Sequence, residues 1–81
     1  MASAREVMGQ LTGIGITEQD AQVITDCVIT RRSCSWVNTD PIDEKVLRDL
    51  HDLIKRNEYG VQISVQAVPT RSKYIWEVRV R

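Results

Sequence analysis

This chain is informative first for what it contains little of. It has no phenylalanine, one histidine, two prolines and two cysteines in 81 residues. Two cysteines are too few for the disulfide framework of a small secreted domain, so we expect Cys27 and Cys34 to be free thiols in a reducing compartment. No stretch approaches the roughly 20 apolar residues of a membrane span, and no N-terminal apolar run resembles a signal peptide. These absences predict a cytoplasmic protein that does not associate with membranes.

The chain also lacks a net charge, because 11 basic and 11 acidic residues balance. A strongly basic surface overall, as in many proteins that bind nucleic acid or anionic membranes, is therefore excluded. The balance is uneven along the chain, since residues 1–60 contain seven basic and ten acidic side chains, whereas residues 61–81 contain four and one. The four basic residues of this C-terminal part are Arg71, Lys73, Arg79 and Arg81.

The length predicts one compact domain that spans residues 1–81. A domain of this size needs most of its apolar side chains for a single core. An enclosed ligand cavity of the usual size, about 300–1,000 Å³, would hollow out most of that core. We therefore expect function to lie on the surface or at an interface between chains.

Three segments have the apolar spacing and the capping residues of helices. Residues 4–12 follow a Ser3–Glu6 capping box and end at glycines. Residues 18–31 follow Thr17, a typical N-cap residue. The strongest pattern has Asp40 as its cap, Pro41 at the first helical position, and an end at residues 57–60. Its apolar residues at helical spacing are Ile42, Val46, Leu47, Leu50, Leu53 and Ile54.

Beyond residue 60 the period of hydrophobicity changes from 3.6 to 2. Residues 61–67 and 74–80 alternate apolar and polar side chains on either side of a turn at 69–72, which predicts an antiparallel hairpin. Residues 34–37 fit either a loop or a short third strand. The predicted fold is α+β, with three helices packed on a small antiparallel sheet in the order α-α-(β)-α-β-β. We expect Leu50 and Ile54 to be buried against the apolar face of the hairpin.

Few residues are available for catalysis or metal binding. The single histidine, His51, could pair with Cys34 as base and nucleophile, but no glycine-rich turn offers an oxyanion hole. With Cys27 these residues supply three zinc ligands, whereas a structural zinc site takes four, with paired ligands at closer spacing. We therefore expect no catalytic residues, no metal, no cofactor and no enzymatic activity.

The candidate functional residues are a tryptophan and the basic residues of the hairpin. Trp36 lies among serines and outside the helical stripes, so it fits a binding hot spot and a cover for the core edge equally well. Together with Arg71, Lys73, Arg79 and Arg81 it forms the predicted partner-binding set. We expect a small protein-binding module or stoichiometric inhibitor, of the kind that phages and mobile elements encode, with a partner that presents an acidic surface. The unpaired edge of the hairpin also predicts a homodimer.

The alternative interpretation is a small winged-helix-like DNA-binding regulator that uses the basic hairpin. Three helices followed by a hairpin have the outline of that fold, and the first two predicted helices have helix–turn–helix lengths. However, the start of the second helix carries Glu18 and Asp20, which phosphates would repel. Binding to nucleic acid therefore ranks below binding to protein.

Overall fold

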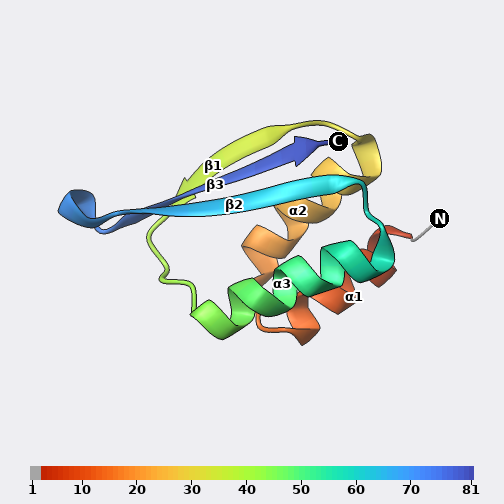
Figure 1. The fold of residues 1–81 in the computed structure, drawn as a ribbon, viewed down its shortest axis with the longest axis horizontal. Helices are drawn as coiled ribbons and strands as arrows, with labels where there is room; N and C mark the ends of the chain where they lie inside the picture. Colours follow the sequence, from red (N-terminus) through yellow and green to blue (C-terminus); the bar gives the residue numbers. More distant parts are fainter. Residues whose placement is uncertain (1–2) are drawn as a thin grey trace.

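The computed structural model describes residues 3–81, in which three helices cover one face of a three-stranded antiparallel sheet (Figure 1). The elements are, in order, α1 (Ala4–Gly13), α2 (Glu18–Thr30), β1 (Cys34–Asn38), α3 (Glu44–Asn57), β2 (Val61–Val68), the 3-10 turn η1 (Pro69–Arg71) and β3 (Lys73–Val80). The predicted α+β fold and its C-terminal hairpin are confirmed. The ambiguous segment near residues 34–37 is a strand.

The first two helices begin where the capping residues predict. The Ser3 hydroxyl accepts a hydrogen bond from the Glu6 amide at 3.2 Å, and the Thr17 hydroxyl accepts one from the Asp20 amide at 3.4 Å. Each bond satisfies one of the amides that have no partner in the first turn of a helix. Between these helices Gly15 adopts a φ of 107°, and a Cβ there would lie 3.2 Å from the Val46 side chain of α3.

The predicted start of the third helix is wrong by one turn. Asp43, and not Asp40, is the N-cap of α3, and its carboxylate accepts a hydrogen bond from the Lys45 amide at 2.9 Å. Pro41 therefore lies before the helix. Ile42, directly before the cap, packs against the hydrophobic core, as a hydrophobic staple does at many helix starts. Two aspartates within four residues offered two possible caps, and this tertiary contact favours the second.

The strands are arranged in the order β1-β3-β2, so the C-terminal strand is central. Trp76 of β3 lies opposite Trp36 of β1 on one side and opposite Val65 of β2 on the other. The basic and aromatic β3 strand therefore has no free edge, and the free edge of the hairpin belongs to β2. The opposite edge of the sheet is formed by the shorter β1.

The core lies between the sheet and the helices. Its fully buried side chains come from α1, α2, α3 and β3, and the largest are Trp76, Leu11, Ile24, Leu50, Val7 and Val78. Leu50 and Ile54 of α3 join the same buried cluster as Val61, Ile63, Trp76 and Val78, as predicted. One continuous core therefore holds the helices to a single face of the sheet.

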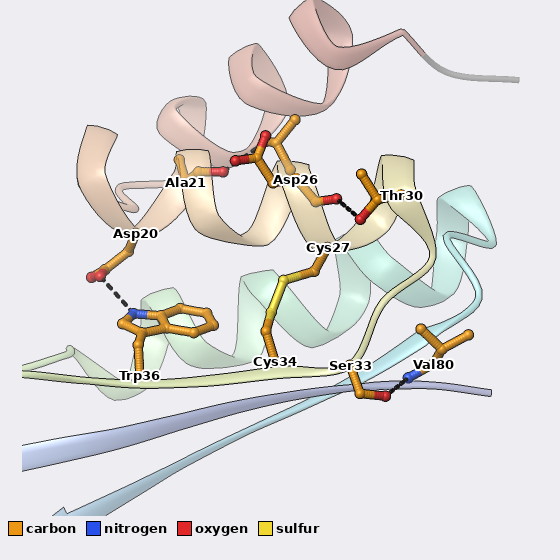
Figure 2. Close-up of a disulfide and its surroundings, with 10 residues drawn as sticks. Asp20, Ala21, Asp26, Cys27, Thr30, Ser33, Cys34, Trp36 and Val80 are labelled. Carbon is orange, nitrogen blue, oxygen red and sulfur yellow. Dashed lines mark hydrogen bonds between the residues drawn. A yellow bond between two sulfur atoms is a disulfide. The ribbon is translucent and has the colours of Figure 1, made fainter.

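The prediction of two free thiols is wrong. Cys27 near the end of α2 and Cys34 at the start of β1 form a disulfide, as Figure 2 shows. The sequence places the two cysteines seven positions apart, and the turn after α2 brings their Cα atoms to 6.6 Å, within the range of bridged pairs. Because disulfides persist mainly in oxidising compartments, the cysteine content no longer supports a cytoplasmic location, which stays a prediction.

Within residues 3–81, none of the helices combines the length and the apolar character that crossing a bilayer requires.

Truncation of the core beneath β2 and β3 should be costly. Leu50 is fully buried, so Leu50→Ala should lower the free energy of unfolding by about 2–5 kcal/mol through lost burial and a residual cavity. Arg56→Ala, an exposed position on the same helix, is the matched control and should cost about 0.5 kcal/mol or less. Urea unfolding measures both, and equal effects of the two substitutions would contradict the packing described.

Reduction of the bridge should also destabilise the protein. Closing a loop of this length removes conformational entropy from the unfolded chain worth about 2.5 kcal/mol. We therefore expect dithiothreitol to lower the thermal midpoint of the wild type measurably. The control is Cys27→Ser combined with Cys34→Ser, whose midpoint should already be low and should not respond to the reductant. A wild type with the same midpoint in both conditions would refute a stabilising bridge.

Candidate functional site

One face of the sheet has no helix over it. In Figure 1 the helices α1, α2 and α3 all lie on the same side of β1, β3 and β2. Side chains alternate between the two faces of a strand, so every second residue points away from the core. These residues are Ser35, Val37, Gln62, Ser64, Gln66, Val68, Lys73, Ile75, Glu77 and Arg79. We call this set the outer sheet face.

An apolar pair lies within the outer sheet face. Val37 of β1 is directly opposite Ile75 of β3, and their residues are 55% and 37% exposed. On the other side of Ile75 lies Gln66 of β2. Single exposed apolar residues are ordinary, but a pair that meets across neighbouring strands forms a continuous apolar surface that water covers only at a cost.

The charges of the outer sheet face come from β3. The Arg79 guanidinium lies 2.8 Å from the Glu77 carboxylate, and both side chains are exposed to solvent. Among residues 3–81, Lys73 and Arg81 form no ion pair. The face therefore carries a net positive charge with one internal ion pair, and the other ten acidic residues of the chain lie outside the strands.

The structure divides the four predicted basic residues into two pairs. Arg71 lies in η1 at the hairpin tip and Lys73 begins β3, whereas Arg79 and Arg81 lie at the other end of that strand. Six residues of extended strand separate Lys73 from Arg79 by roughly 20 Å. Figure 1 shows the hairpin tip extending beyond the helices, so Arg71 and Lys73 are carried on a projecting arm.

Trp36 lies on the opposite, helix-facing side of β1. Its ring stacks on Trp76 with a centroid distance of 5.3 Å. Its indole N–H donates to the Asp20 carboxylate of α2 at 3.0 Å (Figure 2). The side chain is half-buried. Its contact with a partner stays a prediction. Val37, the next residue of β1, points to the outer sheet face, so the two side chains lie on opposite faces of the same strand.

Asp20 is a structural residue that the sequence pattern did not identify. Its other carboxylate oxygen accepts a hydrogen bond from the side-chain amide of Asn38 at 2.7 Å, so both oxygens bind side chains of β1. The residue is buried, and an isolated carboxylate would be costly there without these donors. From the sequence, Asp20 is one of several acidic residues in a first helical turn, and nothing local shows that it faces a strand 16 residues away.

Cys34 and His51, the two residues considered for catalysis, each contact another group. Cys34 is bound in the disulfide, and His51 Nε2 lies 3.1 Å from the carbonyl oxygen of Ile63 on β2. Within residues 3–81, no three histidine, cysteine, aspartate or glutamate side chains form a group able to hold a metal ion. An open groove of about 550 Å³ lies beside His51, between α3 and β2.

Tyr59, a core residue, has a shifted pKa. Burial, and secondly the nearby Glu6 carboxylate, raise the pKa of the Tyr59 phenol. Both causes favour the neutral form, so this shift accompanies burial and does not prepare the phenol for reaction at neutral pH.

Comparison with known proteins adds no family to this description. No protein-family model, no curated protein and no solved structure matches the chain.

The bond between Trp36 and Asp20 predicts an asymmetry between the two sides of β1. Trp36→Phe keeps the stacked ring but removes the donor to a buried carboxylate, so it should lower the free energy of unfolding by about 1–3 kcal/mol. Val37→Ala, the adjacent and exposed position, should cost about 0.5 kcal/mol or less. Chemical denaturation compares the two, and a larger loss from Val37→Ala would show that β1 packs with the reverse orientation.

Proposed function

We propose that the protein is a non-catalytic binding module that docks its outer sheet face onto an acidic surface of another protein. The observation that carries this proposal is that the helices cover one face of the sheet and leave the other exposed, with the Val37–Ile75 pair on it. A module of this kind acts as a stoichiometric inhibitor when the surface that it covers is itself functional. Trp36 would contribute from beneath by holding β1 against α2.

The side chains on the outer sheet face favour a protein partner over a single-stranded nucleic acid. Proteins that bind single strands on a sheet stack bases on exposed aromatic rings. The aromatic residues among residues 3–81 are Trp36, Tyr59, Tyr74 and Trp76, and none belongs to the outer sheet face. An apolar pair flanked by short polar and basic side chains instead fits the composition of a protein interface with a polar rim.

The distribution of charge favours an acidic protein surface over duplex DNA. The strands and the hairpin carry the net positive charge, while the helices and their loops carry a net negative charge. In a winged-helix arrangement the start of α2 would also face the duplex, and its Glu18 and Asp20 repel phosphates. A protein surface can be confined to the sheet and avoid that repulsion.

The projecting hairpin is the feature that supports the alternative, a winged-helix-like DNA-binding regulator. Its tip carries Arg71 and Lys73 beyond the helices, as a wing does (Figure 1). The test below separates the two functions. If these basic side chains contact phosphates, removing them weakens binding to all sequences alike and flattens its dependence on salt.

The proposal predicts that removing positive charges from the sheet slows binding to the partner, whereas removing them from the helices does not. Affinity capture from a nuclease-treated lysate of the source organism should recover a protein partner, and surface plasmon resonance then gives its rates. Arg79→Ala combined with Arg81→Ala should lower the association rate several-fold at low salt and change dissociation little, because these charges steer the approach. Val37→Ala combined with Ile75→Ala should instead raise the dissociation rate.

The matched control removes two positive charges from the helical layer. Lys55→Ala combined with Arg56→Ala changes two exposed residues of α3 and should leave both rates unchanged. If Lys55→Ala combined with Arg56→Ala lowers the association rate as much as Arg79→Ala combined with Arg81→Ala does, the outer sheet face is not the docking surface. Sub-micromolar, salt-sensitive binding to random duplex DNA that requires Arg79 and Arg81 would establish the regulator instead.

A further inference from the structure

The free edge of β2 presents backbone groups that can be assigned from two hydrogen bonds. The Arg81 amide donates to the Gly60 carbonyl at 2.9 Å, so these two residues form a hydrogen-bonded pair at the start of the hairpin ladder. Such pairs alternate with non-bonded pairs along antiparallel strands. The even-numbered residues of β2 therefore bond to β3. The amides and carbonyls that point to the free edge belong to Val61, Ile63, Val65 and Ala67.

His51 confirms this assignment and covers part of the edge. Its Nε2 atom lies 3.1 Å from the Ile63 carbonyl oxygen, which must therefore face away from β3. The helix α3 thus provides a partner for the edge at Ile63. Among residues 3–81, no hydrogen bond is found to the edge amides and carbonyls of Val65 and Ala67.

The part of the β2 edge from Ser64 to Val68 also lacks the features that usually prevent strands from pairing. Natural edge strands are protected by charged residues, prolines, bulges or short length. The eight residues of β2 contain no charge, no proline and no glycine, and the strand pairs without a bulge. The opposite edge, β1, has five residues. The edge from Ser64 to Val68 is therefore both free of partners and open to pairing.

We propose that a second copy of this chain pairs with this edge, antiparallel, about a two-fold axis that passes between Gln66 and Gln66 of the second copy. This register places Val65 opposite Ala67 of the second copy, and the reverse pair on the other side of the axis. The free amides and carbonyls then form about four hydrogen bonds. The product is a continuous six-stranded sheet in the order β1-β3-β2-β2-β3-β1.

The same register leaves the bond of His51 intact. With Gln66 on the axis, Ile63 falls opposite Pro69 of the second copy, and proline has no amide hydrogen to compete for the Ile63 carbonyl. The pairing segment also lies toward the hairpin tip, which extends beyond the helices in Figure 1. Because the strands run antiparallel, the two helical layers lie toward opposite ends of the joined strands.

A second copy suits this edge better than a foreign strand for an electrostatic reason. The pairing segment is uncharged, so two copies approach without repulsion, and a charged peptide gains no complementary partner from it. A two-fold contact is also satisfied by one surface alone, and such contacts are the most common in oligomers. This contact uses the edge of the sheet, so it is compatible with a partner on the outer sheet face and does not depend on one.

Paired charge variants test the axis directly. Sedimentation equilibrium of the wild type from about 1 µM to 1 mM should show a shift from 9.3 kDa toward twice that mass, with a dissociation constant on the order of 10 µM for so small a contact. Gln66→Lys and Gln66→Glu each place like charges opposite one another and should stay monomeric. An equimolar mixture of the two should restore the dimer, since the opposed charges then attract.

The control and a second measurement keep the register falsifiable. Gln62→Lys introduces the same charge on the same face of β2 but outside the pairing segment, so it should still form the dimer. Hydrogen exchange at the Val65 and Ala67 amides should slow as concentration rises, whereas the Ser64 and Gln66 amides, bonded to β3, should be slow throughout. A wild type at 9.3 kDa over the whole range, a Gln66→Lys dimer, or edge amides protected only by another protein would each overturn the proposal.

Discussion

Burial on one side of the sheet is the constraint on which the rest of this structure depends. An 81-residue chain has enough apolar side chains for one core, and all three helices contribute to it from the same side. The hairpin, whose strands alternate apolar and polar residues, suits this arrangement because only one of its faces needs cover. The outer sheet face and the edge of β2 are both exposed because the helices cover only one face of the sheet.

The position of β1 determines how wide the exposed face is. Two connections hold this strand to α2: the Cys27–Cys34 disulfide at its start, and the Asp20 carboxylate that accepts from Trp36 and Asn38 further along. A free two-stranded hairpin is only marginally stable, and β1 adds a third strand and makes β3 central. Without β1 in place, Ile75 would have no apolar residue directly opposite it on the outer face.

The two surfaces proposed for binding differ in the chemistry that they offer. The outer sheet face presents side chains, with basic residues around an apolar pair, and so would select a partner by charge and shape. The β2 edge presents backbone amides and carbonyls with uncharged side chains, and so would select a strand. Because one lies on the face of the sheet and the other along its rim, a dimer would present two outer faces side by side on a continuous sheet. Two such faces would bind a repeating or symmetric partner more tightly than one.

The sequence alone determined those parts of the fold that depend on neighbours along the chain. Capping residues and apolar periodicity are local, and they predicted α1, α2, the hairpin and the burial of Leu50 and Ile54. The sequence also showed that positive charge is concentrated in the hairpin. The length of β3 separates these residues into two pairs, Arg71 with Lys73 and Arg79 with Arg81.

Only the tertiary structure decided the features that join distant segments. The pairing of Cys27 with Cys34 depends on the turn that follows α2, and the role of Asp20 depends on a strand that is placed beside it. The start of α3 depended on which of two aspartates the packing of Ile42 favoured. The inward orientation of Trp36 depended on the register of β1 against β3. The sequence predicted free thiols and a cap at Asp40, which are wrong, did not identify the role of Asp20, and left Trp36 open. The energy of each of these features comes from contacts across the core, which a local pattern does not contain.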